Sequence, residues 1–529
     1  MSLRIYNTLG RTKEVFSPVV PGQVTLYVCG MTTYDLCHIG HGRAMVVFDV
    51  VARYLTSLGY QVKLARNYTD IDDKIINRAH KEGEDPFKLS QRYVDSSRQD
   101  ALTLGCRAPE VEPQVTTHIP QILKFVEDLV AVGKAYPASN GDVYYSVESF
   151  GEYGKLSGKK VDELIAGARV DVIEEKRAPT DFALWKAAKP GEPSWQSPWG
   201  PGRPGWHIEC SAMCAEHLGE TIDIHGGGSD LIFPHHENEI AQSEGLTGKP
   251  LARYWMHNAM LTVNHEKMSK SLGNFFTIRD VLKRYDPEAI RLFYVAHHYR
   301  SPVDYSDRSL EESEAGLERL YQAMRVADRG AGGGNLALLE GLSPTAEGFQ
   351  KLRQLISTGV EEARSHEKAL TPVEKELLEG VAGVFARIDN AMEDDFNTAR
   401  VMGVLFELAR AIGRHVATHP KGTANASLVL RPALLTLAGA ARLFLGLLRM
   451  EPAEFQQDLN QRRLSGRGIS PQEVETLLVD RAAARSRRDW AEADRIRGVF
   501  QGFGISIEDA PTGTTWRVEP ASGVVALES

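Results

Sequence analysis

Two short basic segments, far apart in a chain of 529 residues, carry side chains suited to binding phosphate. His38 and His41 lie in a His-Ile-Gly-His run, and Lys267 and Lys270 lie in a Lys-Met-Ser-Lys-Ser run. When a carboxylate attacks the α-phosphorus of ATP, negative charge grows on the departing pyrophosphate, and preorganised positive charge stabilises it. Each run alone is weak evidence for a phosphate site, because a capped surface helix would account for the first and a solvated loop for the second. Together they favour nucleotide activation.

A second group of residues has the chemistry of a metal site. Cys29, Cys210, His235 and Glu239 offer two thiolates, an imidazole and a carboxylate, which fit tetrahedral zinc. His235 and Glu239 are four residues apart on one predicted helix and therefore share a face. His236, three residues from Glu239, competes with His235. Because the chain has no Cys-x-x-Cys pair, separately buried thiols remain an alternative.

Four further residues fall where a nucleotide or a small substrate would bind. Gly40 leaves room for a base to approach the backbone, and Asp230, after a run of glycines, is placed to accept hydrogen bonds from ribose hydroxyls. Thr69, at the end of a predicted strand, could hold an amino or carboxylate group of the substrate, or could cap a helix. Trp206 could form one wall of a small pocket beside Cys210, or could simply pack.

A strand, a helix and a second strand surround the first basic motif. Residues 24–29 are predicted as a short buried strand, residues 38–58 as a helix with apolar positions at helical spacing, and residues 61–67 as a second strand. Gly59 ends the helix. This order is typical of parallel nucleotide-binding sheets, whose ligands gather where the strands end.

The pattern breaks between about residues 116 and 205, which we interpret as an insertion between two halves of the sheet. It contains a predicted strand at 142–147 and a segment dense in Pro and Gly at 189–205. The parallel pattern then resumes with a strand at 221–225, a helix opening near Pro234, where proline suits the first turn, and a strand at 254–262.

After the second basic motif the chain becomes helical. Apolar spacing predicts helices at 278–284, 287–296 and 310–325, a glycine-rich flexible joint at 330–335, and a bundle reaching to about residue 448. From about residue 456 a final unit contains arginines at helical spacing, with Trp490 among them. An aromatic plane beside arginines can stack and clamp an unpaired RNA base, although a solvated charged helix would show the same pattern.

Composition limits the classes of protein that fit. A net charge of -9 argues against indiscriminate coating of nucleic acid, and 42% hydrophobic residues are ample for packed cores. Five cysteines are too few and too scattered for a disulfide framework, and Cys37, Cys106 and Cys214 are expected to be packing or surface residues. We expect a cytoplasmic protein with no membrane association, because neither an apolar span of about 20 residues nor a secretion signal is apparent.

The two basic motifs, Cys29-Gly30 and the segments 206–210 and 233–239 resemble the class I aminoacyl-tRNA synthetases and, among them, the cysteinyl-tRNA synthetase family. The resemblance covers nearly the whole chain. It implies an α/β Rossmann-type parallel-sheet catalytic domain with an inserted segment, an α-helical bundle and a small mixed α/β C-terminal domain. The expected units are 1–115 and 206–262 for the halves of the catalytic domain, 116–205 for the connective insertion, 263–310 for the lysine loop and stem-contact region, 311–455 for the tRNA-binding bundle and 456–529 for the anticodon-binding domain.

The resemblance also implies an activity. The chain would convert L-cysteine and Mg-ATP to cysteinyl-adenylate and pass the cysteinyl group to the 3' end of tRNA(Cys). One Zn2+ per chain would select the substrate thiolate, since a steric pocket separates close analogues by only about 1 to 3 kcal/mol. The implied roles are catalysis by His38, His41, Lys267 and Lys270; ATP binding by these four with Gly40 and Asp230; cysteine binding by Gly30, Thr69 and Trp206; metal binding by Cys29, Cys210, His235 and Glu239; and tRNA binding by Arg485, Trp490, Asp494 and Asp509.

Three departures from the family pattern concern loops. Met31 stands where proline is common, Ser229 occupies a usually apolar position, and residues 330–375 look longer than in compact members. Two rivals remain: a ligase that gives cysteine to an amino sugar by the same adenylate chemistry, and a non-catalytic zinc and RNA-binding relative. About 80 C-terminal residues argue against the first, and the intact basic motifs argue against the second. A monomer is the default expectation.

Overall fold

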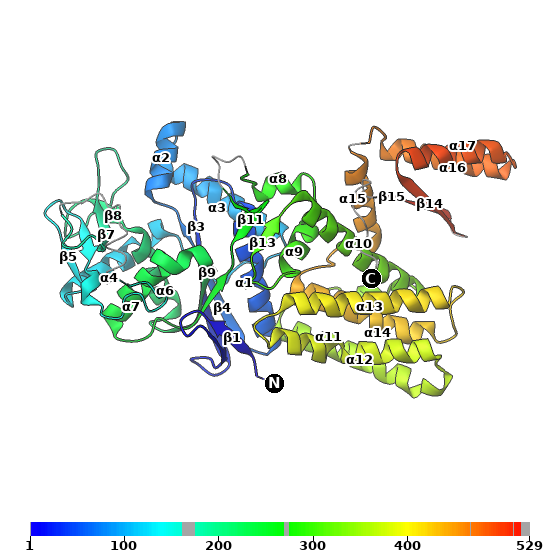
Figure 1. Cartoon of the computed structure of the whole chain (residues 1–529), viewed down its shortest axis with the longest axis horizontal. Coiled ribbons are helices and arrows are strands. Elements are labelled where there is room, and N and C mark those ends of the chain that lie inside the picture. Colours follow the sequence, from blue (N-terminus) through cyan, green and yellow to red (C-terminus); the bar gives the residue numbers. More distant parts are fainter. Residues whose placement is uncertain (1, 161–174, 269–273, 466, 511–512, 520–529) are drawn as a thin grey trace.

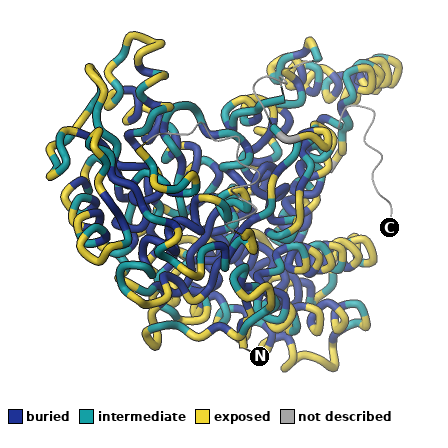
Figure 2. The backbone as a smooth tube through the Cα atoms, turned by 60° about the vertical axis from the view of Figure 1, so that its left-hand side comes forward, coloured by how far each residue is buried: buried dark blue, intermediate teal, exposed yellow. Residues whose placement is uncertain are grey.

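The computed structural model describes residues 2–160, 175–268, 274–465, 467–510 and 513–519. Figure 1 shows a sheet with its helices at the left and centre, a bundle of long helices at the lower right, and two further helices that extend to the upper right. Figure 2 shows the buried stretches running together through the middle of the molecule. One continuous hydrophobic core joins the sheet to the bundle. The bundle is therefore attached firmly to the sheet.

The central sheet is parallel and has four strands in the order β10-β9-β3-β4. They are β3 (Gln23–Thr32), β4 (Gln61–Thr69), β9 (Ile222–Gly228) and β10 (Ala252–Asn258). The chain leaves β3 for β4 on one side and later returns to β9 on the other. The point where the strand order reverses lies between β3 and β9, and ligands bind at such a point, beyond the carboxyl ends of the strands. The expected Rossmann-type sheet is confirmed.

Helix α1 (Ile39–Ser57) connects β3 to β4 and is buried along most of its length. Its apolar residues face the sheet on one side and the bundle on the other. Two more helices follow β4, namely α2 (Asp73–Glu82) and α3 (Pro86–Thr103). Both start with an aspartate cap, Asp72 and Asp85, whose side chain accepts backbone N–H groups.

The segment expected as an insertion contains its own antiparallel sheet, β5 (Ala135–Pro137), β6 (Val143–Tyr145), β7 (Phe182–Ala187) and β8 (Gly202–Pro204). Helix α4 (Ile119–Ala131) and helix α6 (Trp206–Leu218) pack with it around Trp185 and Tyr145. A two-stranded hairpin, β1 (Arg4–Asn7) and β2 (Thr12–Val15), starts the chain. The boundaries between the units remain predictions.

The helix predicted to open near Pro234 begins three residues later, as α7 (Glu237–Thr247). It is preceded by one wide turn at Ile232–His236, inside which Phe233 has a non-helical backbone (φ -141°, ψ 131°). A residue before proline is driven out of the α region, so Phe233 cannot continue a regular helix. The helical turn therefore starts again after Pro234.

The strand predicted at 254–262 is two strands in two different sheets. β10 ends at Asn258, and β11 (Leu261–Val263) pairs with β12 (Glu266–Lys267) and with β13 (Val303–Tyr305). The short helices α8 (Ile278–Leu282) and α9 (Pro287–Val295) complete this region. The sequence pattern did not show the break because only two residues, Ala259 and Met260, separate the two strands.

The bundle consists of α10 (Asp307–Gly330), α11 (Ala346–Ser365), α12 (Pro372–Met392), α13 (Thr398–Thr418) and α14 (Ala426–Ala440). The segment Ala426–Leu445 is the one helix among the described residues that is long and apolar enough to cross a membrane. Because 83% of its most apolar window is buried within the protein, it is a core helix. The predicted joint at 330–335 lies between the end of α10 and a short 3-10 turn at Asn335–Leu339.

The final unit contains α15 (Pro452–Leu464), α16 (Pro471–Ser486), α17 (Trp490–Gly502) and a hairpin of β14 (Ile505–Ala510) and β15 (Gly513–Val518). The prediction that the arginines of this unit lie on one helix is wrong. Arg488 has a positive φ of 63° and Asp489 caps α17, so the chain turns between α16 and α17. The arginines therefore belong to two helices.

Candidate active site and metal centre

One cavity of about 400 Å³ opens at the carboxyl edge of the parallel sheet. Its lining includes His38, Gly40 and His41 at the start of α1, with Asp230 beyond β9. It also includes Gly30, Thr69, Trp206, Cys29, Cys210 and His235. Two groups of residues predicted from the sequence thus share one space.

His38 and His41 hold each other at the start of α1. The Nδ1 atom of His38 accepts the backbone N–H groups of Gly40 (3.1 Å) and His41 (3.3 Å), and the Nδ1 atom of His41 accepts the N–H of His38 (3.2 Å). The two rings stack with their centroids 3.6 Å apart. Because Nδ1 accepts in both rings, any ring proton is on Nε2, from where it can be donated to a phosphate oxygen.

His41 remains neutral at ordinary pH, because burial, and secondarily the charge of His38, lowers its pKa well below the usual range. The alternative interpretation of this motif was a capped surface helix. His38 is indeed the N-cap of α1, but α1 is buried and not exposed. A Cβ at Gly40 would come within 2.9 Å of the His38 ring. Glycine is thus required for the close stacking of this turn.

The lysine motif is only partly described. The backbone of Lys267 ends the short strand β12, and Met268 lines the cavity. Lys270 lies outside the described residues, so its predicted role stays a prediction, as does that of the Lys267 side chain. The segment that follows is tied to the histidine motif, because Ile39 N–H donates to Phe276 O (3.1 Å) and Ile278 N–H donates to Cys37 O (2.9 Å).

The four predicted metal ligands come together from three separate places in the chain. One ligand atom from each of Cys29, Cys210, His235 and Glu239 lies within 4.8 Å of every other. Cys29 follows the buried part of β3, Cys210 lies on α6, and the other two lie on and just before α7. These donors are of the types that bind zinc in proteins, and four is the number of ligands in a tetrahedral site.

The charge of this cluster also fits a cation. A hydrogen bond from Cys29 lowers the pKa of Cys210 to about 6, which favours a thiolate at neutral pH. Burial alone would raise the pKa of Glu239, but His225 and His235 hold it well below its usual range. The cluster therefore presents a buried thiolate and carboxylate. Against the opposing effect of burial, their charge raises the pKa of His235 to about 10, and a metal ion bound there would take the place of the His235 proton.

Neighbouring histidines orient two of the ligands. The Nε2 atom of His225 contacts Glu239 Oε2 at 2.7 Å, leaving Oε1 directed at Cys29 (3.2 Å) and His235. The Nδ1 atom of His235 contacts Nδ1 of His207 at 2.9 Å, so its Nε2 is left for the cluster. Hydrogen bonds of this kind hold metal ligands in position in other proteins.

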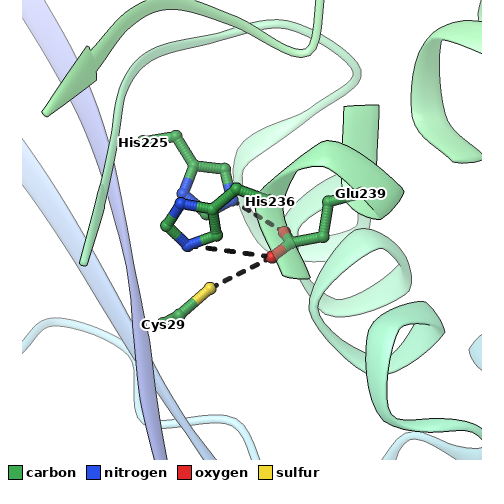
Figure 3. Close-up of side chains that lie close together, drawn as sticks. All are labelled: Cys29, His225, His236 and Glu239. Atoms are coloured by element: carbon green, nitrogen blue, oxygen red, sulfur yellow. Dashed lines mark hydrogen bonds and ion pairs between the residues drawn. The ribbon is translucent and has the colours of Figure 1, made fainter. Parts of the chain in front are cut away.

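A second combination of residues competes for the same ion. Figure 3 shows Cys29, His225, His236 and Glu239, whose ligand atoms also lie within 4.8 Å of one another. The combination lacks Cys210, the cysteine whose pKa is lowered to about 6. The Nε2 of His236 lies 4.0 Å from Glu239 Oε1, against 3.0 Å for Nε2 of His235. These contacts favour the predicted four residues.

The three residues predicted to bind the amino acid surround the cluster. Thr69 is buried and donates its hydroxyl to Glu209 Oε2 (2.8 Å), and it does not cap a helix, since α2 is capped by Asp72. Trp206 stacks on His235, with ring centroids 4.6 Å apart. A Cβ at Gly30 would lie 1.6 Å from the carbonyl oxygen of Asn67, so only glycine allows β3 to approach β4 here.

The predicted tRNA contacts lie far along the chain, on α16, α17 and β14. Trp490 is 59% exposed at the start of α17, and Asp494 follows one turn later. Asp509 accepts both Nη atoms of Arg481 at 2.9 Å and also pairs with Arg485. Arg485 and Asp509 therefore join β14 to α16, whereas Trp490 offers an exposed ring.

Several residues of the site were not singled out from the sequence. These are His207, which contacts His235, Glu209, which accepts from Thr69, and His225, which contacts Glu239. The only sequence signal for them was that His207 and Glu209 are close to Cys210 in sequence and that His225 precedes the glycine run. Cys37, Cys106 and Cys214 are buried, so they are packing residues and not surface residues. Met31 contacts Cys37 (Sγ to Sδ 3.1 Å) and lines the cavity.

Comparison with family models divides the chain into three matched parts. Residues 15–315 match the class I tRNA synthetase (C) catalytic domain, residues 387–448 match the DALR domain, and residues 470–517 match the cysteinyl-tRNA ligase anticodon binding domain. The first match alone covers more than half of the chain.

Curated relatives match over nearly the full length. The cysteine–tRNA ligase of Pelobacter propionicus is 50% identical over 525 residues, covering 98% of this chain and 100% of the relative. That of Geobacter metallireducens is 48% identical with the same coverage. Among solved structures, Mycobacterium tuberculosis methionyl-tRNA synthetase with methionyl-adenylate superposes with a TM-score of 0.57 at 13% identity, over 84% of this chain and 96% of that one. At such low identity this last match shows the fold alone.

Proposed function

The chain belongs to the cysteine–tRNA ligase family of class I tRNA synthetases, and from that premise we propose how its cavity performs the reaction. It is a ligase that joins L-cysteine to tRNA(Cys) with ATP, in two steps that pass through cysteinyl-adenylate. One observation carries the assignment of the site: the paired histidines of α1 and the thiol–imidazole–carboxylate cluster line the same cavity. The phosphates and the thiol of the two substrates would therefore lie within reach of each other.

We assign the phosphate half of the cavity to His38 and His41. Their Nε2–H groups would donate to the triphosphate at the start of α1, where the helix dipole also favours negative charge. Lys267 and Lys270 would add positive charge as pyrophosphate leaves, together with the Mg2+ that accompanies ATP. Asp230, exposed at the cavity, would accept the ribose hydroxyls.

We assign the metal to Cys29, Cys210, His235 and Glu239. A zinc ion bound there would accept the thiolate of cysteine as a further ligand, whereas serine offers a hydroxyl that is far harder to deprotonate. His207 and His225 hold two of these ligands, His235 and Glu239, and Trp206 stacks on His235. Thr69 and Gly30 would hold the amino and carboxylate groups of the amino acid.

We place the tRNA along the side of the molecule that joins the cavity to the final unit. Trp490 would stack on an anticodon base, and Arg485, Asp494 and Asp509 would supply polar contacts near it. A monomer working in the cytoplasm, where tRNA is charged, completes the proposal. The rival that transfers cysteine to an amino sugar is not supported, because residues 470–517 match an anticodon binding domain.

The test of the site is ATP–pyrophosphate exchange that depends on an amino acid, measured on protein whose zinc content is known. The proposal expects exchange with cysteine, background exchange with serine, and about one zinc per chain. Equal exchange with both amino acids would contradict the proposed selection by the metal.

A further inference from the structure

Strand β10 ends in a side chain that neither the motifs nor the family comparison single out. Asn258 is 5% exposed and lines the cavity together with Gly40, His41 and Asp230. Its Oδ1 atom is buried and has no hydrogen-bond partner among the residues that the structure describes. Since buried polar atoms nearly always have a partner, an unpartnered acceptor on a residue that lines a binding cavity points to a donor on the ligand.

The alternation of side chains along β10 shows which substrate Asn258 faces. Trp255 stacks on His225, and His257 contacts His236, so these two side chains point to the metal cluster. Met256, between them, belongs to the buried core that contains α1. Asn258 follows Met256 at a spacing of two and therefore lies on the α1 side, with the nucleotide rather than the amino acid.

The carboxamide of Asn258 is held in one orientation. Its Nδ2 donates to the carbonyl oxygen of Ala259 (3.3 Å), and the same carbonyl accepts Nη1 of Arg43 at 2.7 Å. Turning the amide over would break the first bond and would bring two oxygens together. The orientation thus leaves an acceptor, and not a donor, without a partner among the described residues.

Arg43 is unusual because it is fully buried and pairs with no carboxylate among the described residues. Its guanidinium instead donates to backbone carbonyls of two turns, one before and one after the lysine motif in sequence. The first turn supplies Ala259 and Met260, and the second supplies His298, Tyr299 and Ser301. Arg43 lies two residues after His41 on α1. It therefore fixes the turn after β10 relative to the histidine motif.

We propose that Asn258 reads the 6-amino group of adenine and rejects 6-oxo purines, and that Arg43 is the positioning residue that maintains this acceptor. The inference rests on the proposed function, since it takes the cavity to bind ATP. A 6-amino group donates to Oδ1, whereas the 6-oxo group of inosine or guanosine triphosphate presents an oxygen to an oxygen. Sites that hydrogen-bond a substrate group discriminate well against an analogue that lacks it.

The direct test is cysteine-dependent pyrophosphate exchange with ATP and with purine riboside triphosphate, which has hydrogen at position 6. Asn258→Ala should raise the KM for ATP about threefold to tenfold, the effect of one neutral hydrogen bond, and should leave the KM for the purine analogue unchanged. Asn77→Ala, an exposed asparagine on α2, is the matched control. An equal change for both nucleotides would overturn the assignment to the 6-amino group.

Two deoxynucleotides separate the base from the ribose. If the penalty of Asn258→Ala persists with 2'-deoxy-ATP and 3'-deoxy-ATP, the base assignment stands. If it disappears with either of them, Asn258 reads a ribose hydroxyl and the assignment to adenine is wrong. Arg43→Lys should reduce the preference for ATP over inosine triphosphate at least about threefold, since an ammonium cannot serve both turns. An equal loss of affinity for both nucleotides would overturn the positioning role.

Equilibrium binding provides a readout without catalysis. Titration calorimetry of wild type and Asn258→Ala with ATP, inosine triphosphate and purine riboside triphosphate should give the same ranking as the exchange assay. Failure of wild type to exchange with cysteine would contradict the proposed function but leave this titration intact. Identical nucleotide affinities of wild type and Asn258→Ala would contradict the inference alone.

Discussion

The Nδ1 atom of His38 accepts the backbone N–H of His41, and the Nδ1 atom of His41 accepts the backbone N–H of His38. This reciprocal pair explains why two histidines three residues apart can act together at a helix start. Both rings are held by their Nδ1 atoms. In the proposed function, the two side chains that cap the helix also bind the phosphates.

His41→Ala should lower the rate of cysteine activation strongly. Removing one preorganised donor to a developing charge costs about 10²- to 10³-fold in kcat. The check is pyrophosphate exchange at saturating ATP and cysteine. The exposed His80→Ala on α2 is the control. A kcat for His41→Ala within about threefold of wild type would remove His41 from the catalytic group.

The metal assignment predicts different behaviour for two adjacent histidines. His235→Asn should lose most of its zinc, measured by elemental analysis of purified protein, because the change removes one of four ligands. His236→Asn should keep it, because in the favoured set His236 only lies beside the cluster. The reverse result would select the combination drawn in Figure 3. Far-ultraviolet circular dichroism would show that both variants are folded.

A buried ion pair predicts acid-dependent stability. Burial alone would raise the pKa of Asp49, but Arg53 and Arg291 hold it at about 2. Asp49→Asn should lower the free energy of unfolding at pH 7 by about 3–5 kcal/mol, since it leaves buried guanidinium groups unpaired. Asp128→Asn, which breaks an exposed pair with Lys124, should cost under about 1 kcal/mol.

The pH dependence of that difference follows from the sign of the shift. The folded pKa of Asp49, about 2, lies below the unfolded value of about 3.9. The carboxylate therefore stabilises the fold fully above about pH 4, and the contribution is lost as the pH falls toward 2. Scanning calorimetry should show the gap between wild type and Asp49→Asn narrowing below pH 4. A gap that stays constant with pH would contradict the assignment of the pair.

Replacing Trp490 should affect transfer to tRNA without affecting the activation of cysteine. Trp490→Ala should leave cysteine-dependent pyrophosphate exchange unchanged, because the residue is remote from the cavity, and it should raise the KM for tRNA. Loss of one base–aromatic stack is worth about 1–3 kcal/mol. The exposed Val479→Ala on α16 is a control for surface truncation in the same unit. Unchanged charging kinetics in Trp490→Ala would exclude the ring from tRNA binding.

The sequence was sufficient for the parts of the site that local patterns encode. Cys29, Cys210, His235 and Glu239 were predicted from donor chemistry and family resemblance. The fold brings one ligand atom of each together, and their binding of a metal stays a prediction. The parallel strands were found because buried strands are continuous apolar runs. Their bounds differ by a few residues, since β3 and β4 continue past the apolar part into the cavity.

What the sequence could not show depends on contacts between distant segments. From the sequence, Arg43 would be predicted as an exposed helical arginine. Its burial depends on the turns at Ala259 and His298, which are distant in sequence and contact it only in the folded protein. The turn at Arg488 was missed because arginine is a good helix former, and only its positive φ and the cap at Asp489 reveal the break. The predicted start of α7 is three residues too early, because proline is common in the first turn of a helix and Pro234 fits that pattern.

The central claim is that this chain selects cysteine at a thiol-binding metal site and attaches it to tRNA. The most direct measurement is transfer of radiolabelled amino acid to acid-precipitable tRNA with ATP and magnesium, comparing cysteine with serine, in wild type and Cys210→Ser. The account predicts that wild type charges tRNA with cysteine and not with serine, and that Cys210→Ser loses zinc and most of the charging. Charging by Cys210→Ser at the wild-type rate and selectivity would contradict it.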